Sequence, residues 1–224
     1  MQMHHHSRIP ARPLRALLAS ALLSSCFVPC VAQAVDFPVT GTITVNGNPG
    51  ALPAGGTFGD SSYDTATGDI AVGHFTFPQS TTTFHSVSLG ADVTVTYQLS
   101  QTNTSTGLVA NDGVAMLTQA QLKLKAISAV VGVVPVAFGN SCIFQPINVD
   151  LAGTGAASGL DLSQTGFTIP QVGATDCSGF GSQVNSGLAG SNNNILMHMA
   201  GDFTPPSAND TIFANGFESP NRAE

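Results

Sequence analysis

Three aspartates stand close together in the first half of the chain and are the first side chains whose chemistry has to be considered. Asp60, Asp64 and Asp69 fall within one short stretch, and Ca²⁺ prefers clustered oxygen ligands. Their spacing fits no EF-hand loop, and Asp64 to Gly68 is typical of a hairpin turn with a left-handed glycine. We therefore interpret them as turn residues and expect no bound metal.

Three histidines, His74, His85 and His198, lie beyond the N-terminal region, each in a strand-like stretch. Imidazoles that converge from different strands can bind zinc. No carboxylate or cysteine stands beside these histidines at the spacing of a ligand set. We therefore expect hydrogen-bonded structural histidines and no cofactor.

Ser61 is the one candidate nucleophile, in the block Thr57-Phe58-Gly59-Asp60-Ser61. The block resembles the FGDS block of the GDSL/SGNH hydrolases, which implies a hydrolase with Ser61 as nucleophile. That family also uses a Gly and an Asn as oxyanion donors and a late Asp-x-x-His. Asn111 lacks the family's Gly two positions earlier, and Ile195 stands where the Asp would precede His198. Because a serine without a base is a weak nucleophile, we interpret the block as a polar turn.

The four cysteines divide into two pairs by position. Cys26 and Cys30 belong to the N-terminal region, whereas Cys142 and Cys177 lie in the body of the chain and form no C-x-x-C motif. An even pair in an exported chain predicts a disulfide, worth about 3–4 kcal/mol by loop entropy. Two strand-like runs, 143–151 and 160–169, flank the turn-rich AGTGAASG, so we expect the bond to tie the edges of a two-strand unit.

Residues 1–34 have the form of a secretory signal peptide. Three arginines make a basic n-region, an apolar run follows, and Ala32-Gln33-Ala34 is a signal-peptidase site. We expect cleavage between Ala34 and Val35 and a secreted protein that is periplasmic, cell-surface or extracellular. The apolar run is too short for a transmembrane helix. Leu23 to Cys26 also has the form of a lipobox, which leaves lipidation at Cys26 as an alternative.

Signal removal would leave three basic residues against thirteen acidic ones, a formal charge of −10. This balance argues against nucleic acid and anionic membranes as partners, because both need basic patches. Lys123 and Lys125 form the one basic spot. We interpret them as charges that keep an edge strand from pairing with its neighbours.

Residues 35–203 are rich in Thr, Ser, Gly, Asn and Val, a composition that favours strands joined by tight turns. Residues 93–99 alternate cleanly between apolar and polar, and on residues 70–77 we expect Val72 and His74 to share a face with Ile70, opposite Phe75. Residues 115–131 fit helical spacing as well as alternation, and we prefer a strand. One short helical turn is expected after Cys177. The prediction is an all-β fold, a single β-sandwich or barrel-like domain of roughly eight to ten short, mainly antiparallel strands.

Residues 204–224 begin as a Pro- and Ser-containing linker and continue as a polar tail that we expect to be disordered. Residues 210–218 resemble the short D-x-I-F-x-x-G-F-E tail of many otherwise unrelated secreted bacterial proteins. The matching residues are Asp210, Ile212, Phe213, Gly216, Phe217 and Glu218. The resemblance implies an export, sorting or surface-association role, with the export or sorting machinery as partner.

These patterns lead to one leading function and two alternatives. The leading hypothesis is an exported, non-catalytic binding or structural module of the envelope or the extracellular space. The first alternative is a secreted hydrolase that uses Ser61. The second is a pilus-type or adhesin subunit, which would pair through a strand edge.

Overall fold

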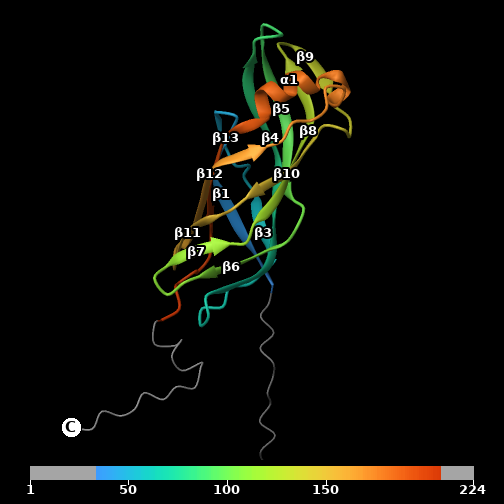
Figure 1. Cartoon of the computed structure of the whole chain (residues 1–224). Coiled ribbons are helices and arrows are strands. Elements are labelled where there is room, and N and C mark those ends of the chain that lie inside the picture. The colour runs from blue at the N-terminus through green and yellow to red at the C-terminus, as the bar shows by residue number, and fades with distance from the viewer. Residues whose placement is uncertain (1–33, 208–224) are drawn as a thin grey trace, which may run out of the picture. The chain divides into compact units, whose positions relative to one another are not determined.

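The computed structural model describes residues 34–207, and this part of the chain is built almost entirely of strands (Figure 1). The strands are β1 (Val35–Val45), β2 (Asn48–Ala51), β3 (Gly56–Ser61), β4 (Asp69–Ser86), β5 (Ala91–Gln101), β6 (Ser105–Val109), β7 (Val114–Leu117), β8 (Ala120–Val131), β9 (Val134–Ala137), β10 (Ile143–Val149), β11 (Ala152–Ala156), β12 (Gly159–Ile169) and β13 (Gly190–Met199). The helical elements are a 3₁₀ turn, η1 (Cys177–Gly179), and α1 (Gly181–Leu188). Within the described residues, no helix has the length and apolar character needed to cross a membrane. The expected all-β fold is confirmed, with more strands than expected.

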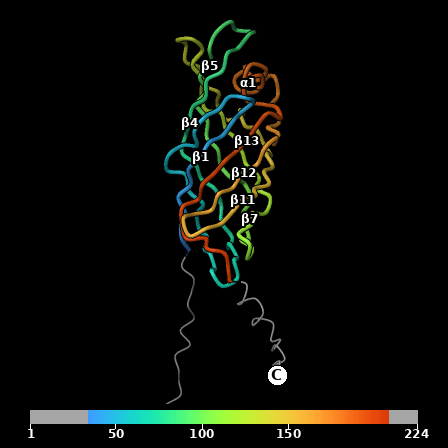
Figure 2. Tube along the Cα trace, turned by 90° about the vertical axis from the view of Figure 1, so that its left-hand side faces the viewer, coloured from blue at the N-terminus to red at the C-terminus, as the bar shows by residue number. Residues whose placement is uncertain are grey.

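Part of the sheet closes on itself as an antiparallel barrel. Its strands follow the order β4-β3-β1-β13-β12-β11-β7-β6, and β6 pairs back with β4. Figure 2 shows β1, β13, β12, β11 and β7 in this order. The long strand β4 belongs to two parts of the sheet, because its first residues pair with β6 and its later ones with β5. Beyond β5, the strands β8, β9 and β10 extend the sheet away from the barrel.

The strand alternation expected from the sequence positions the core. On β5 every second residue is buried: Val93, Val95, Tyr97 and Leu99. On β8, Leu122 and Leu124 are buried and alternate with exposed Gln121 and half-buried Lys123 and Lys125. Apart from residues 118 and 119, residues 115–131 are therefore strands, as preferred. The apolar face of each strand is fixed by its period of two.

The interpretation of the two lysines is wrong. β8 pairs with β5 along one edge and with β10 and β9 along the other. Lys123 and Lys125 thus lie on an inner strand, where no edge needs protection. The Lys125 ammonium donates to Asn140 Oδ1 at 3.1 Å.

The face assignment on β4 is also wrong, because the strand is irregular there. The register of β4 against β6 shifts between Ile70 and Gly73. Ile70 and Phe75 are therefore both buried, whereas Val72 is 52% exposed. A bulge of this kind moves side chains to the opposite face.

The expected two-strand unit between the cysteines does not exist. β10 pairs with β8, and most of the turn-rich AGTGAASG is the strand β11, which forms a hairpin with β12. A Cβ atom on Gly153 would lie 1.7 Å from the carbonyl oxygen of Asp161. Glycine here permits close strand approach, and it does not mark a turn.

The predicted disulfide is confirmed, but it joins other elements than expected. Cys142 and Cys177 are fully buried, and their Cα atoms are 4.5 Å apart. Cys142 precedes β10, and Cys177 begins η1 in the connection between β12 and β13. The bond therefore anchors the η1–α1 connection to the extended sheet. This connection contains the short helical segment expected after Cys177.

The signal peptide and the tail motif remain predictions. Residues 1–33 and 208–224 lie outside the described part of the chain. Val35 is the first residue of β1, and the matched tail residues are among those not described.

Candidate functional site

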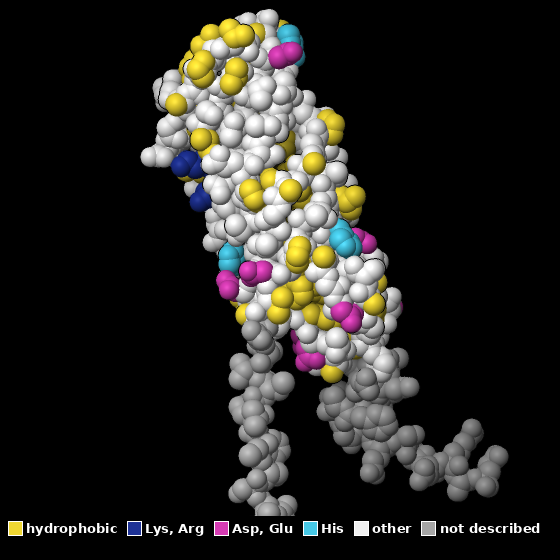
Figure 3. Space-filling model, turned by 180° about the vertical axis from the view of Figure 1, so that it is seen from behind, with side chains coloured by type: hydrophobic (Ala, Val, Ile, Leu, Met, Phe, Trp, Pro, Cys, Tyr) yellow, Lys and Arg dark blue, Asp and Glu magenta, His cyan; other side chains and the backbone are white. Residues whose placement is uncertain are grey.

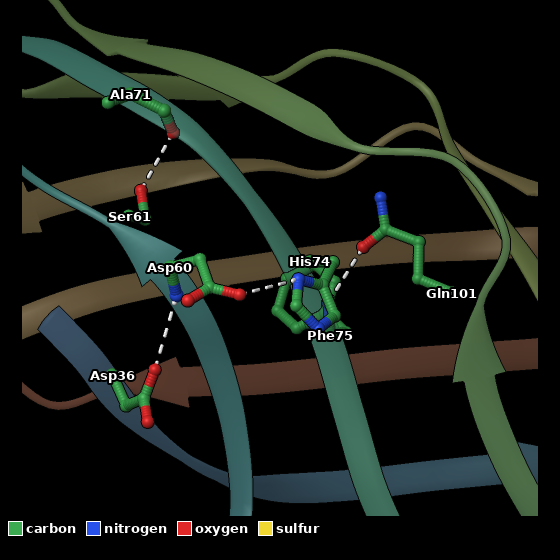
Figure 4. Close-up of polar contacts among 7 residues, drawn as sticks. All are labelled: Asp36, Asp60, Ser61, Ala71, His74, Phe75 and Gln101. Atoms are coloured by element: carbon green, nitrogen blue, oxygen red, sulfur yellow. Dashed lines mark hydrogen bonds and ion pairs between the residues drawn. The ribbon is translucent and has the colours of Figure 1, made fainter. Parts of the chain in front are cut away.

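Ser61 ends β3 with its side chain turned into the protein. The residue is 1% exposed, and its hydroxyl donates to the carbonyl oxygen of Ala71 at 2.7 Å (Figure 4). His198 lies on β13, which is separated from β3 by β1. The His198 side chain is 41% exposed, so it lies on the outside of the barrel wall while Ser61 points inward. The fold does not bring these two hydrolase candidates together.

A β-bulge next to Ser61 does bring two carboxylates and a histidine close to one another. The register of β1 against β3 shifts between Val35 and Phe37, and Asp60 takes a left-handed conformation with φ of 58°. The Asp60 N–H donates to Asp36 Oδ1 at 3.2 Å, and the Asp60 carboxylate lies 3.7 Å from His74 Nδ1. Figure 4 shows Asp60 between Asp36 and His74. The group is open to solvent, since the Asp60 side chain is 81% exposed.

Each of the three described histidines has an aspartate beside it on a neighbouring strand. His85 and Asp92 are direct register partners on β4 and β5, with Nδ1 and Oδ1 2.9 Å apart. His198 and Asp161 are register partners on β13 and β12, at 2.7 Å. The expectation of hydrogen-bonded histidines agrees with this geometry for His85 and His198, whereas His74 lies 3.7 Å from the Asp60 carboxylate, beyond hydrogen-bond distance. The carboxylate partners were missed, because only the strand register places Asp92 and Asp161 opposite the histidines.

Two of the three aspartates considered for calcium, Asp64 and Asp69, are used by the local turn, whereas Asp60 lies in the bulge described above. The Asp64 carboxylate accepts from the Ala66 N–H at 2.8 Å, and its carbonyl accepts from the Gly68 N–H at 2.7 Å. Asp69 Oδ2 accepts from the Thr67 hydroxyl at 2.8 Å. Gly68 has a φ of 80°, as the sequence predicts. Between residues 34 and 207, no group of three or more His, Cys, Asp or Glu side chains is placed to hold a metal ion.

Tyr63 contacts the segment of residues 202–204 that follows β13. Its hydroxyl donates to the Thr204 carbonyl oxygen at 2.6 Å, and its ring lies 5.1 Å from that of Phe203. Burial, with smaller contributions from Asp202 and Asp64, raises the pKa of Tyr63 above its usual value. Hydrogen bonds from Thr204 lower the pKa of Asp202. These contacts fasten the last described segment to the barrel.

Exposed hydrophobic side chains gather at the end of the domain where the β4–β5 and β8–β9 turns lie. We call Val87, Leu89, Val130, Val133 and Val134 the apolar tip. Val87 is 89% exposed and Val133 is 92% exposed. Val87 and Leu89 lie in the β4–β5 turn and Val133 lies in the β8–β9 turn, whereas Val130 and Val134 belong to the adjoining ends of β8 and β9. The two turns are neighbours because Val93 pairs with Val131. Figure 3 shows hydrophobic side chains at this end, with a histidine and an acidic side chain beside them.

The helix α1 covers this end of the sheet and borders two hollows. One is small and almost entirely apolar in lining. The other is a polar hollow of about 450 Å³ that Asn46 and Asn185 help to line. Both amides are already used, because Asn46 Nδ2 donates to the Ser186 carbonyl and Asn185 bonds both backbone groups of Val172. The two amides that help to line the polar hollow therefore already serve the fold through these hydrogen bonds.

Comparison of the chain with protein-family models, with curated proteins and with solved structures gives no match.

Proposed function

We propose that the protein is an exported, non-catalytic module of the bacterial envelope or extracellular space that works by binding or by structural support. The apolar tip carries this proposal. Valines that are about nine-tenths exposed cost free energy in water, and grouped exposed hydrophobic residues mark interaction sites. Only uncharged residues occupy the chain from 86 to 91 and from 126 to 141, which suits contact with an uncharged surface or ligand.

The hydrolase alternative is weakened by the bond that Ser61 makes. A nucleophilic serine needs its hydroxyl beside a base and open to substrate. The Ser61 hydroxyl is itself buried and instead donates to the carbonyl oxygen of Ala71 on β4. The pilus-type or adhesin alternative has one supporting observation. Among the described strands, β9 pairs only with β8, so its other edge has no strand partner there. Polymers of the exported chain on size-exclusion chromatography would favour that alternative.

A hydrolysis assay tests the proposal. The exported chain should hydrolyse short and long p-nitrophenyl esters no faster than buffer. Ser61→Ala should leave that rate unchanged and lower the free energy of unfolding by about 1 kcal/mol, the value of one hydrogen bond. Ester hydrolysis that disappears in Ser61→Ala would overturn the non-catalytic assignment.

Intact mass tests export. Protein recovered outside the cytoplasm should begin at Val35 and carry a disulfide. A lipidated chain beginning at Cys26 would instead establish the lipobox alternative, and a chain that retains residues 1–34 in the cytoplasm would contradict export.

A further inference from the structure

The turn between β1 and β2 carries an Asn-Gly pair, Asn46-Gly47, a sequence that is prone to spontaneous deamidation. In that reaction the glycine nitrogen attacks the side-chain carbon Cγ of the asparagine, and the Cγ–Nδ2 bond breaks. The proton of the glycine N–H leaves with the departing amide as ammonia. Water then opens the cyclic imide and leaves aspartate or isoaspartate. Glycine favours the attack because it has no side chain to hinder its nitrogen.

The fold requires this sequence at the turn. Val45 pairs with Asn48, so the loop between the strands has only two residues. Asn46 has a φ of 47° and Gly47 a φ of 83°. A two-residue hairpin turn with both φ angles positive favours Asn-Gly above other pairs. The turn therefore brings the chemical lability of the pair with it.

Three hydrogen bonds hold the reacting groups apart from one another. The Gly47 N–H donates to the Asn192 carbonyl oxygen on β13 at 2.8 Å, so the attacking nitrogen is engaged. The leaving amide is engaged too, because Asn46 Nδ2 donates to the Ser186 carbonyl oxygen on α1 at 2.8 Å. The Asn46 N–H donates to Asn193 Oδ1 at 2.7 Å. The first two bonds have to open before the new nitrogen–carbon bond can form.

The surroundings of Asn46 supply water and make the product unsuitable for the contact. Asn46 helps to line the polar hollow of about 450 Å³, so water reaches its side chain. A carboxylate at this position accepts hydrogen bonds and donates none, and it would face the Ser186 carbonyl oxygen, a second acceptor. Isoaspartate would also add a backbone atom to a turn whose length sets the strand register.

We propose that Asn46 is a deamidation site whose reactivity is controlled by the contact of the β1–β2 turn with α1 and β13. The reaction proceeds from the open form of this contact and needs only water as co-reactant. Conversion to aspartate or isoaspartate then releases α1 from the turn. The site is separate from the apolar tip, and the inference does not depend on the proposed binding function.

Peptide mapping of the full exported chain tests the gating. The chain is incubated at one pH and temperature in buffer and in a urea concentration that unfolds it, and aspartate and isoaspartate at position 46 are quantified by mass spectrometry. Deamidation in buffer should be at least about tenfold slower, because two ordinary hydrogen bonds must open first. A synthetic peptide of residues 42–51, with and without urea, reports the effect of urea itself.

Hydrogen exchange of the Gly47 amide measures the same opening without a substitution. The bond to Asn192 must break both for exchange and for attack by the Gly47 nitrogen. Folding should therefore slow deamidation of Asn46 at least as much as it slows exchange of this amide.

Asn193→Ala removes the acceptor of the Asn46 N–H and should speed deamidation in buffer about threefold to tenfold, the equivalent of one hydrogen bond. Asn148→Ala, at an exposed position on β10, is the matched control and should leave the rate unchanged. The dispersion of ¹H–¹⁵N spectra reports whether each variant is folded.

Asn46→Asp tests the consequence of the modification, because it places the product carboxylate opposite the Ser186 carbonyl. Hydrogen exchange in α1 should become about threefold to tenfold faster in this variant. Asn48→Asp makes the same change of charge two residues away and should leave exchange in α1 as it is.

The inference is overturned if Asn46 deamidates as fast in buffer as in urea, or stays unmodified in the unfolded chain. It is equally overturned if deamidation is slowed less than exchange of the Gly47 amide, or if a folded Asn193→Ala chain deamidates no faster than Asn148→Ala. Equal exchange in α1 of Asn46→Asp and Asn48→Asp would contradict the proposed release of the helix.

Discussion

Removal of the disulfide is the perturbation whose effect follows most directly from the fold. The variant is the double substitution Cys142→Ala/Cys177→Ala. Both sulfurs are buried, and the bond anchors the η1–α1 connection beside β10. That connection keeps other anchors without it, because the Ser178 hydroxyl donates to the Ala137 carbonyl at 3.0 Å and Val184 is buried. We therefore expect the folded state to persist and the loss to arise mainly in the unfolded chain.

The magnitude follows from the length of the closed loop. The cysteines are 35 residues apart, and the chain-entropy relation gives about 4 kcal/mol at 25 °C for a loop of this length. For a domain of this size, 1 kcal/mol corresponds to about 2–4 °C in Tm. The double variant should therefore melt roughly 8–16 °C below the oxidised protein.

Urea denaturation of three samples is the appropriate assay: the oxidised protein, the same protein with its disulfide reduced, and the double variant. The last two should agree with each other and lie about 4 kcal/mol below the first. A double variant within about 1 kcal/mol of the oxidised protein would refute the loop-entropy reasoning. Selective loss of hydrogen-exchange protection in α1 would show instead that the bond acts by holding the helix in place.

Three further predictions concern packing, buried polarity and alkaline pH. Gly187→Ala should lower the free energy of unfolding by about 1–3 kcal/mol, because the new Cβ would lie 2.2 Å from the Phe84 ring. Ser182→Ala, at an exposed position on the same helix, is the control, and equal stability of the two variants would contradict the clash. Asn193 is fully buried and its side chain forms hydrogen bonds with three backbone groups. Asn193→Ala should therefore lower the free energy of unfolding measured by urea denaturation by about 2–4 kcal/mol. A loss under about 1 kcal/mol would count against the importance of these bonds. Burial raises the pKa of Tyr97 above its usual 10.0. The contribution of the protonated Tyr97 to the free energy of unfolding is therefore complete below pH 10 and is lost as the pH rises through the higher folded-state pKa. Tyr97→Phe should flatten the alkaline fall in unfolding free energy, and an unchanged pH profile would refute this.

Local patterns were sufficient for much of the fold. Alternation on β5 and β8 identified the buried residues, because a strand that faces a core has only one apolar side. The turn at Asp64 to Gly68 was also readable, since its aspartate cap and left-handed glycine are properties of adjacent residues. Both conclusions concern residues close together in the chain.

The sequence determined that the chain is rich in strands, that Cys142 and Cys177 are suited to pair, and where the core faces of the regular strands lie. Only the tertiary structure decided that β10 pairs with β8, that a glycine-rich stretch becomes β11, and that Ser61 points inward. It also brought each histidine beside an aspartate and placed Asn46 against Ser186 of α1. The physical reason is that strand pairing joins residues far apart in the chain, and a bulge of one residue reverses the face of every side chain that follows it.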